Sequence, residues 1–293
     1  MNDFHLDFLK FEKLHGLGND YILLNDIELM IPEEKKSALA FKLCQNHFSI
    51  GADGLIFVCT SDVADIKMRI FNNDGSEAEM CGNGIRCFCK YIYENKIIKK
   101  NEIKIETLKG VLGAKLNIID DQVKSVRIDM GAPILDCKHI PVVSESESDK
   151  CINQKIFLLD QSFNFTAVSM GNPHAVIFVE EQLDDVQLNK YGPLMESHSI
   201  FPKKVNTEFV KIISDTESRV RVFERGVGIT KSCGTGACAA VVAGVQLGHF
   251  KQNFPIVVHN DGGDLVITYT GETVFLEGPI ERTFYGYIQN LDI

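Results

Sequence analysis

The sequence predicts an α+β protein made of two pseudo-symmetric lobes that derive from an internal duplication, each a mixed β-sheet wrapped around one central helix. Three observations support this prediction. Sequence landmarks recur at an offset of about half the chain, strand patterns outnumber helical ones in each half, and the strongest helical segment of each half is apolar on almost every side. A chain of 293 residues is also long enough for about two domains, because single cores stop growing near roughly 250–300 residues.

The repeat is clearest at two cysteine-glycine motifs. Residues 81–87 (CGNGIRC) match residues 233–239 (CGTGACA), and their first cysteines lie 152 positions apart. An arginine stands twelve residues before each cysteine and opens the same basic-aliphatic-aromatic pattern, Arg69 in one half and Arg221 in the other. The pairs at 18–19 and 171–172 are both Gly-Asn, and residues 54–58 align with 206–210. Four landmarks in one order, at offsets of 152 or 153 residues, favour a duplicated domain.

The elements of each half follow from local patterns. Short alternating or β-branched runs bounded by turn residues predict strands over residues 103–105, 126–128, 209–213, 256–258 and 265–267, and the basic-aliphatic-aromatic pattern indicates strands at 69–71 and 221–223. Residues 32–45 predict an outer helix in the first half. A helix follows Gly84, because the next apolar residues recur at i, i+3, i+4 and i+7. Another follows Gly236, where residues 237–245 are apolar all round and Gly248 offers a stop. Such helices have to be buried, which places one at the centre of each sheet.

Composition and charge exclude several classes of protein. With 45% hydrophobic and 24% charged residues, the chain is typical of globular domains. A formal net charge of −10 would repel phosphate backbones and anionic lipid, so we expect neither a nucleic-acid nor a membrane partner. The first residues lack a signal-peptide pattern, and no stretch reaches the roughly 18 apolar residues of a membrane span. We therefore expect a cytoplasmic protein.

Cysteine and histidine usage argues against disulfides and metal. The nine cysteines are an odd number in a long chain, so we expect all of them to be thiols. No C-x-x-C pair occurs, and the histidines lack the spacings that bring metal ligands onto one face. The glycine-rich segments at residues 16–19 and 226–228 fail the dinucleotide-binding pattern at its third glycine. We expect neither a metal nor a cofactor.

The two cysteine-glycine motifs carry the candidate chemistry. Glycines at 82, 84, 234 and 236 remove side chains where backbone N–H groups point out of a helix N-terminus, which leaves a site for a carboxylate. The same positive potential is expected to lower the pKa of Cys81 and of Cys233. If both helix starts face one cleft, a thiolate on one face of an amino-acid α-carbon and a thiol on the other would remove and return a proton. The stereocentre would invert, while backbone donors stabilise the negative charge on the carboxylate.

Five motifs in order closely resemble the diaminopimelate epimerase family: residues 15–21 (HGLGNDY), 71–77 (FNNDGSE), 81–84 (CGNG), 170–174 (MGNPH), and 224–226 (ERG) with 233–238 (CGTGAC). The resemblance covers nearly the whole chain from about Phe11. It implies a cofactor-independent isomerase that interconverts LL- and meso-diaminopimelate on the route to lysine and the peptidoglycan cross-link. It also implies lobes that are strand barrels around a central helix, and a homodimer. We expect residues 1–130 to form the first lobe, completed by about 279–293, and 131–278 the second, with the active site in the cleft between them.

The resemblance also implies roles for individual residues. Cys81 and Cys233 would be the acid/base pair, with His174 and Glu224 as further candidate catalytic residues. His174 would tune or orient, Glu224 would also contact a substrate ammonium, and Arg225 would hold the distal carboxylate in a bidentate manner. The remaining implied substrate contacts are the backbone amides of Gly82, Asn83, Gly234 and Thr235, and the side chains of Asn19, Asn72, Asn172 and Asn206.

Three other functions stay open from the residues alone. A proline-racemase-like enzyme would use two cysteines on a substrate with one amino-acid head, for which Arg225 and the asparagines would be surplus. A thiol hydrolase or transferase would pair one cysteine with His174, and the duplicated cysteine would then have no purpose. A non-enzymatic protein would bind dicarboxylic amino acids in the same cleft without turnover.

Overall fold

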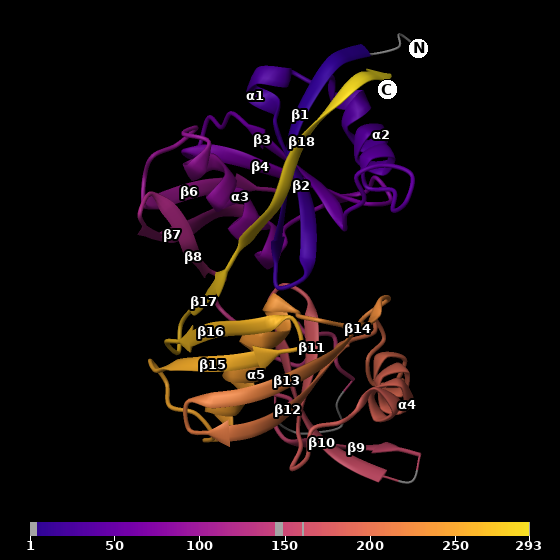
Figure 1. Cartoon of the computed structure of the whole chain (residues 1–293). Helices are drawn as coiled ribbons and strands as arrows, with labels where there is room; N and C mark the ends of the chain where they lie inside the picture. The colour runs from indigo at the N-terminus through magenta and orange to yellow at the C-terminus, as the bar shows by residue number, and fades with distance from the viewer. Residues whose placement is uncertain (1–4, 144–148, 160, 293) are drawn as a thin grey trace. The chain divides into compact units, whose positions relative to one another are not determined.

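The computed structural model describes residues 5–143, 149–159 and 161–292, and the chain divides into two compact units. Unit 1 contains the chain up to Ile128 and from Gly278 onward, and unit 2 runs from Asp129 to Glu277. Each unit is a mixed sheet packed around one central helix (Figure 1). The predicted α+β architecture is confirmed.

In unit 1 the sheet surrounds α3 (Gly82–Glu94), which is buried from Gly82 to Ile92. Strands β1 and β2 are antiparallel, β2 and β3 parallel, β3 and β4 antiparallel, β4 and β6 parallel, and β6, β7 and β8 antiparallel. The short β5 pairs with β4, and the C-terminal β18 pairs with β1. The other elements are α1 (Asp26–Leu29), α2 (Glu33–Leu43), β1 (His5–Gly16), β2 (Asn19–Asn25), β3 (Gly54–Cys59), β4 (Ile66–Asn72), β5 (Glu77–Ala78), β6 (Glu102–Thr107), β7 (Gly110–Ile119), β8 (Gln122–Asp129) and β18 (Glu281–Asp292).

Unit 2 repeats this order of pairings around α5 (Gly234–Gln246). Strands β10 and β11 are antiparallel, β11 and β12 parallel, β12 and β13 antiparallel, β13 and β15 parallel, and β15, β16 and β17 antiparallel. The short β14 pairs with β13, and β9 pairs with β10. The other elements are α4 (Asp185–Glu196), β9 (Gln154–Leu158), β10 (Gln161–Ser169), β11 (Pro173–Phe178), β12 (Asn206–Ser214), β13 (Glu217–Glu224), β14 (Gly228–Thr230), β15 (Pro255–Asn260), β16 (Gly263–Tyr269) and β17 (Val274–Pro279).

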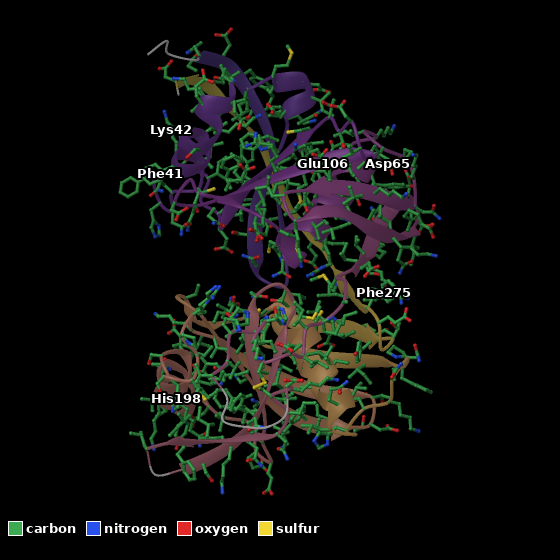
Figure 2. All side chains as sticks on the ribbon, turned by 180° about the vertical axis from the view of Figure 1, so that it is seen from behind. Phe41, Lys42, Asp65, Glu106, His198 and Phe275 are labelled. Atoms are coloured by element: carbon green, nitrogen blue, oxygen red, sulfur yellow. A yellow bond between two sulfur atoms is a disulfide. The ribbon has the colours of Figure 1, made fainter. Side chains whose placement is uncertain are left out.

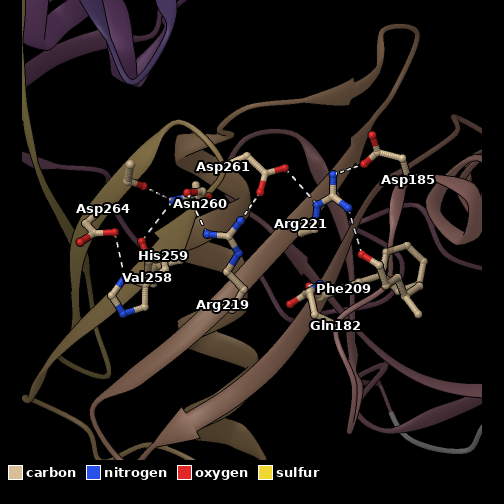
Figure 3. Close-up of polar contacts among 12 residues, drawn as sticks. Gln182, Asp185, Phe209, Arg219, Arg221, Val258, His259, Asn260, Asp261 and Asp264 are labelled. Atoms are coloured by element: carbon tan, nitrogen blue, oxygen red, sulfur yellow. Dashed lines mark hydrogen bonds and ion pairs between the residues drawn. The ribbon is translucent and has the colours of Figure 1, made fainter.

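The repeated arginine of the sequence landmarks ties an outer helix to the sheet in each unit. Arg69 on β4 bonds Glu33, the first residue of α2, at 2.5 Å. Arg221 on β13 bonds Asp185, the first residue of α4, and its Nε lies 3.0 Å from Asp261 (Figure 3). Glu33 and Asp185 are themselves 152 positions apart. The duplication therefore extends to the outer helices and the ion pairs that hold them.

The sequence analysis predicts α2 but misses α4. Residues 185–196 contain Gly192 and Pro193, which disfavour a helix interior. The helix forms because Asp184 and Gln187 make a reciprocal capping box at its start, and because Leu188, Tyr191 and Met195 are buried on its inner face.

The expectation that all nine cysteines are thiols is wrong for one pair. Cys137 and Cys151 form a buried disulfide in unit 2, with Cα atoms 5.5 Å apart. An isolated bridge between the neighbouring residues Asp136 and Lys150 brings the two segments together. This proximity depends on the tertiary path of the loop, which spacing alone does not reveal. Cys81 and Cys233 are free.

The helices in the described residues are short, and the outer helices α2 and α4 each have an exposed face. Figure 2 shows Phe41 and Lys42 on α2, where Phe41 is 54% exposed. Within residues 5–143, 149–159 and 161–292, no helix is long and apolar enough to cross a membrane.

Candidate active site

Cys81 and Cys233 occupy equivalent positions, because each is the N-cap residue of the central helix of its unit. Both have extended backbones, with φ −137° and ψ 124° at Cys81 and φ −118° and ψ 111° at Cys233. The carbonyls of both cysteines accept the first helical hydrogen bonds at 2.9 Å. The N–H groups that follow have no acceptor within the helix. Each thiol therefore lies beside the positive end of a helix dipole, as predicted from the glycine pattern.

In unit 1, a small polar network surrounds Cys81. The hydroxyl of Tyr21 lies 2.9 Å from the Cys81 Sγ and 2.6 Å from the Asn19 Oδ1, so it can donate to either. The amide Nδ2 of Asn83 donates to the same Asn19 oxygen at 3.3 Å, and Asp53 accepts from the Asn19 Nδ2 at 2.6 Å. The structure thus brings together three predicted residues, Asn19, Cys81 and Asn83.

Tyr21 is a site residue that the sequence analysis missed. It lies two residues after Asn19 on β2, and side chains at i and i+2 of a strand share one face. This alternation could have identified Tyr21 from the sequence, because its hydroxyl lies on the same face of the apolar strand as the side chain of Asn19.

A fully buried arginine fixes the first turn of α3. Arg86 donates from Nη2 to the Asn83 Oδ1 at 2.9 Å and from Nη1 to the Gly82 carbonyl at 3.1 Å. Because these bonds hold Asn83 and the backbone at Gly82, the amides assigned to carboxylate binding lie on a rigid element.

In unit 2, an unbroken series of contacts leads from Cys233 into the core. The Thr235 Oγ1 lies 3.5 Å from the Cys233 Sγ, and the Asn172 Nδ2 donates to that hydroxyl at 3.3 Å. The Asn172 Oδ1 faces the His174 Nε2 at 3.0 Å, and the His174 Nδ1 faces the Glu208 Oε1 at 2.7 Å. The side chains of His174 and Glu208 are both completely buried.

Glu208 is the second residue that the sequence analysis missed. It was used only as part of the aligned run 206–210. The available signal was a carboxylate at Glu208 inside a strand pattern, directly before the apolar residues Phe209 and Val210. An acid that is buried in such a strand is almost always paired.

Glu224, at the end of β13, lies close to the same cysteine. The hydroxyl of Thr230 donates to its carboxylate, and Cys233 contributes a further side-chain hydrogen bond. Burial raises the pKa of Glu224 above its usual value, and the nearby Glu208 charge acts in the same direction.

The predicted lowering of the Cys233 pKa is wrong. Burial, followed by the charges of Glu224 and Glu208, raises the pKa of Cys233 well above that of an ordinary thiol. Hydrogen bonds from the Thr235 hydroxyl and the Gly236 N–H favour the thiolate, but desolvation outweighs them. The helix N-terminus alone does not decide the protonation of a cysteine that lies among buried carboxylates.

We expect the alkylation of Cys233 by iodoacetamide to rise with pH only above the range of a free thiol, whose pKa is ~8.5. The thiolate is the nucleophile, and the raised pKa delays its formation. Glu224→Gln removes the largest electrostatic cause of the shift, so its profile is expected at lower pH. Mass spectrometry of the Cys233 peptide gives both profiles.

The control is Glu217→Gln, at the opposite end of β13 from Glu224. It is expected to leave the pH profile of Cys233 alkylation unchanged. A wild-type midpoint at or below that of a free cysteine would contradict the raised pKa.

The remaining predicted residues have local bonds of their own. Asn72 is exposed and donates from Nδ2 to the Ser76 hydroxyl at 3.0 Å within its own turn. Asn206 is buried, donates to the Pro173 carbonyl at 2.8 Å and accepts the Arg225 N–H at 3.0 Å. Asn206 therefore joins the loop that carries Asn172 to the loop that carries Arg225.

No cluster of three or more His, Cys, Asp or Glu side chains that could hold a metal ion occurs in the part of the chain that the structure describes. The side chains described at the two helix starts supply thiols, carboxylates, amides, hydroxyls and one imidazole.

A sequence model of the diaminopimelate epimerase family matches residues 11–135 and 166–283. The chain is 48% identical over 277 residues to the diaminopimelate epimerase of Bacillus cytotoxicus, covering 94% of this chain and 96% of that protein. It is 48% identical over 281 residues to the diaminopimelate epimerase of Bacillus mycoides, covering 94% and 97%. Among solved structures, a hydroxyproline epimerase from Agrobacterium vitis superposes with a TM-score of 0.69 at 14% identity over 98% of this chain and 94% of that one.

Proposed function

The chain belongs to the diaminopimelate epimerase family and is an isomerase of diaminopimelate, and we propose that it interconverts the LL and meso forms through Cys81 and Cys233 without a cofactor. Family membership supports the reaction. The equivalent positions of the two cysteines, each at the start of a central helix, support the mechanism.

In the proposed reaction, the thiolate of one cysteine takes the α-hydrogen as a proton and becomes a thiol. The electron pair left on the α-carbon delocalises into the adjacent carboxylate. The thiol of the other cysteine then donates its proton to the opposite face of the carbon and becomes a thiolate. The stereocentre is inverted, no net proton is consumed, and the reverse reaction exchanges the two roles.

The backbone amides of Gly82, Asn83, Gly234 and Thr235 are proposed to bind the reacting carboxylate. Helix N-termini stabilise anions through free N–H groups and the helix dipole. The charge on the carboxylate grows as the α-proton leaves, so these donors bind the transition state more strongly than the substrate. By mutational precedent, one such donor contributes roughly 2.7–4 kcal/mol.

The second amino-acid head of the substrate is assigned to polar side chains. We assign the distal carboxylate to Arg225, whose exposed guanidinium bonds the Lys203 carbonyl at 3.0 Å and, among the described residues, no carboxylate. Glu224 is assigned to a substrate ammonium, and His174 to tuning Cys233. The assigned polar contacts are Asn19, Asn72, Asn172 and Asn206.

The observation that carries the proposal is the duplicated N-cap cysteine, and solvent isotope exchange tests it. Incubation of the wild-type protein with LL-diaminopimelate in heavy water is expected to produce the meso form with deuterium at one α-carbon. A binding protein would incorporate no deuterium, and that result would overturn the proposal. Turnover of proline but not diaminopimelate would instead support the racemase alternative.

We further propose a cytoplasmic homodimer. A reducing compartment keeps catalytic thiols reduced, while the Cys137–Cys151 disulfide is buried away from soluble reductants. For the dimer, the supporting feature is an exposed aromatic patch, defined as Phe8 on β1 with Tyr285 and Tyr287 on β18, each at least half exposed. Phe8 and Tyr287 stack with ring centroids 4.6 Å apart. Aromatic residues that protrude together from paired strands are typical of protein interfaces.

Tyr287→Glu is expected to shift the protein from dimer to monomer, because it places a charge in an interface that excludes water. Light scattering coupled to size exclusion measures the mass. Phe157→Glu, at another exposed aromatic residue (68% exposed) on β9, is the matched control and is expected to leave the mass unchanged. An unchanged dimer in Tyr287→Glu would show that the interface lies elsewhere.

A further inference from the structure

We propose that Glu208 is a positioning residue: it holds His174 as a doubly protonated imidazolium, which fixes the Asn172 amide and, through it, the Thr235 hydroxyl beside Cys233. The consequence for catalysis rests on the proposed function, whereas the protonation of His174 can be measured without it.

The partners of His174 determine its protonation. Its Nδ1 lies 2.7 Å from the Glu208 carboxylate and its Nε2 lies 3.0 Å from the Asn172 Oδ1. With the Asn172 amide oriented as in this structure, both partners are acceptors, and this arrangement is satisfied when both ring nitrogens carry a hydrogen. The ring and the carboxylate are fully buried, and a buried charge persists only when it is paired. A carboxylate–imidazolium pair satisfies both conditions with a charge-assisted hydrogen bond.

The imidazolium sets the direction of the bonds that follow. An imidazolium at His174 stabilises the observed orientation of the Asn172 amide, in which the Oδ1 faces the ring and the Nδ2 donates to the Thr235 Oγ1 at 3.3 Å. The Thr235 oxygen then accepts, and its own hydrogen is left to point at the Cys233 Sγ, 3.5 Å away. A thiolate at Cys233 would therefore receive a hydroxyl donor. A neutral His174 with an unprotonated Nε2 would instead accept a hydrogen bond from the Asn172 Nδ2. The amide would then be flipped, with its oxygen toward the Thr235 hydroxyl.

The fold makes room for the carboxylate against the first turn of α5. A Cβ added at Gly236 would lie 2.5 Å from the Glu208 Oε1 and 3.2 Å from the Cys233 Cβ. Because glycine has no side chain, the Glu208 carboxylate can approach the N-terminus of α5 at Gly236. Glu224 is a second carboxylate that interacts electrostatically with His174.

The duplicated unit shows that the fold does not require this carboxylate. At the sequence offset of 152, Glu208 corresponds to Ile56, a fully buried apolar residue on β3. At the offset of 153 that relates the two Gly-Asn pairs, His174 corresponds to Tyr21, which contacts the Cys81 Sγ directly with a neutral hydroxyl. Unit 1 therefore supports its cysteine with one uncharged donor, while unit 2 uses an ion pair that acts through two intermediate side chains. Glu208 belongs to the chemistry of the second cysteine rather than to the architecture of the sheet.

Nitrogen-15 NMR of histidine-labelled protein tests the protonation state, with the His174 signals assigned by comparison with His174→Gln. We expect both ring nitrogens of wild-type His174 to be protonated at neutral pH. Glu208→Gln keeps the shape and an acceptor but removes the charge, so one nitrogen is expected to lose its hydrogen. A neutral wild-type His174, or an unchanged spectrum in Glu208→Gln, would overturn the proposal whatever the protein's substrate.

Steady-state kinetics with diaminopimelate test the consequence. Loss of one buried charge-assisted hydrogen bond corresponds to roughly a 10- to 100-fold loss of kcat, with KM little changed because Glu208 does not touch substrate. Asp26→Asn is the matched control: it removes the charge from another buried ion pair, with Lys36 at 2.9 Å in unit 1, and is expected to retain kcat. If Glu208→Gln changed the NMR signals but not kcat, the orientation of Asn172 would not matter for turnover and the positioning role would be refuted. An inactive wild-type protein would instead refute the proposed function.

Discussion

Replacing either Cys81 or Cys233 by alanine is expected to reduce epimerisation at least about 10²- to 10⁴-fold, the contribution typical of a positioned general acid or base. Inversion needs one group to remove the proton and another to return it from the opposite face, so neither cysteine can replace the other. Coupled measurement of optical rotation and deuterium incorporation in heavy water separates the two steps.

The two measurements are expected to respond differently. Each single variant keeps one cysteine, which can still remove and return a proton on its own face, so slow exchange without inversion is expected from one isomer only. Cys89→Ala and Cys238→Ala change completely buried cysteines inside the same two helices and serve as controls for folding. Near-wild-type inversion by Cys81→Ala or Cys233→Ala would rule out the paired mechanism.

Much of the fold was predictable because the duplication constrains it. The repeat of Arg69 at Arg221 and of Cys81 at Cys233 predicted equivalent units, and the structure extends that equivalence to the ion pairs with Glu33 and Asp185. The central helices were predictable because helical segments that are apolar on almost every side have to be buried. The disulfide between Cys137 and Cys151 was not predictable, since it depends on where a loop returns in space.

Site residues that lie in short sequence motifs were predictable. Effects that depend on burial among distant residues were not. The helix-start position of Cys233 followed from its neighbouring glycines, but its raised pKa depends on Glu208 and Glu224, which approach from other strands. Tyr21 and Glu208 were missed for the same reason. Tyr21 contacts Cys81 and Glu208 contacts His174, and each of these pairs is far apart in the sequence.

Gly236→Ala is expected to cost much more activity than Gly84→Ala, although the two glycines occupy equivalent positions three residues after the N-cap cysteines. A Cβ at Gly84 would lie 3.1 Å from the Ile70 Cδ1 and 3.2 Å from the Ile56 Cδ1, which are terminal methyl groups that can shift by a few tenths of an ångström. At Gly236 the same atom would lie 2.5 Å from the Glu208 Oε1. That oxygen is held by His174 in a fully buried pair and cannot move without breaking it.

The expected result for Gly236→Ala is a loss of kcat of about 100-fold, the effect of a displacement of roughly 1 Å in a catalytic arrangement. Thermal unfolding of both variants is the control, because alanine favours a helix over glycine by roughly 0.5–1 kcal/mol. At position 84 that gain is expected to offset the small clash, so stability stays close to wild type. At position 236 the displaced carboxylate leaves buried charges without their partners, and the unfolding temperature is expected to fall together with kcat. Equal losses of kcat in the two variants would mean that the helix backbone, rather than the Glu208–His174 pair, limits substitution of the two glycines.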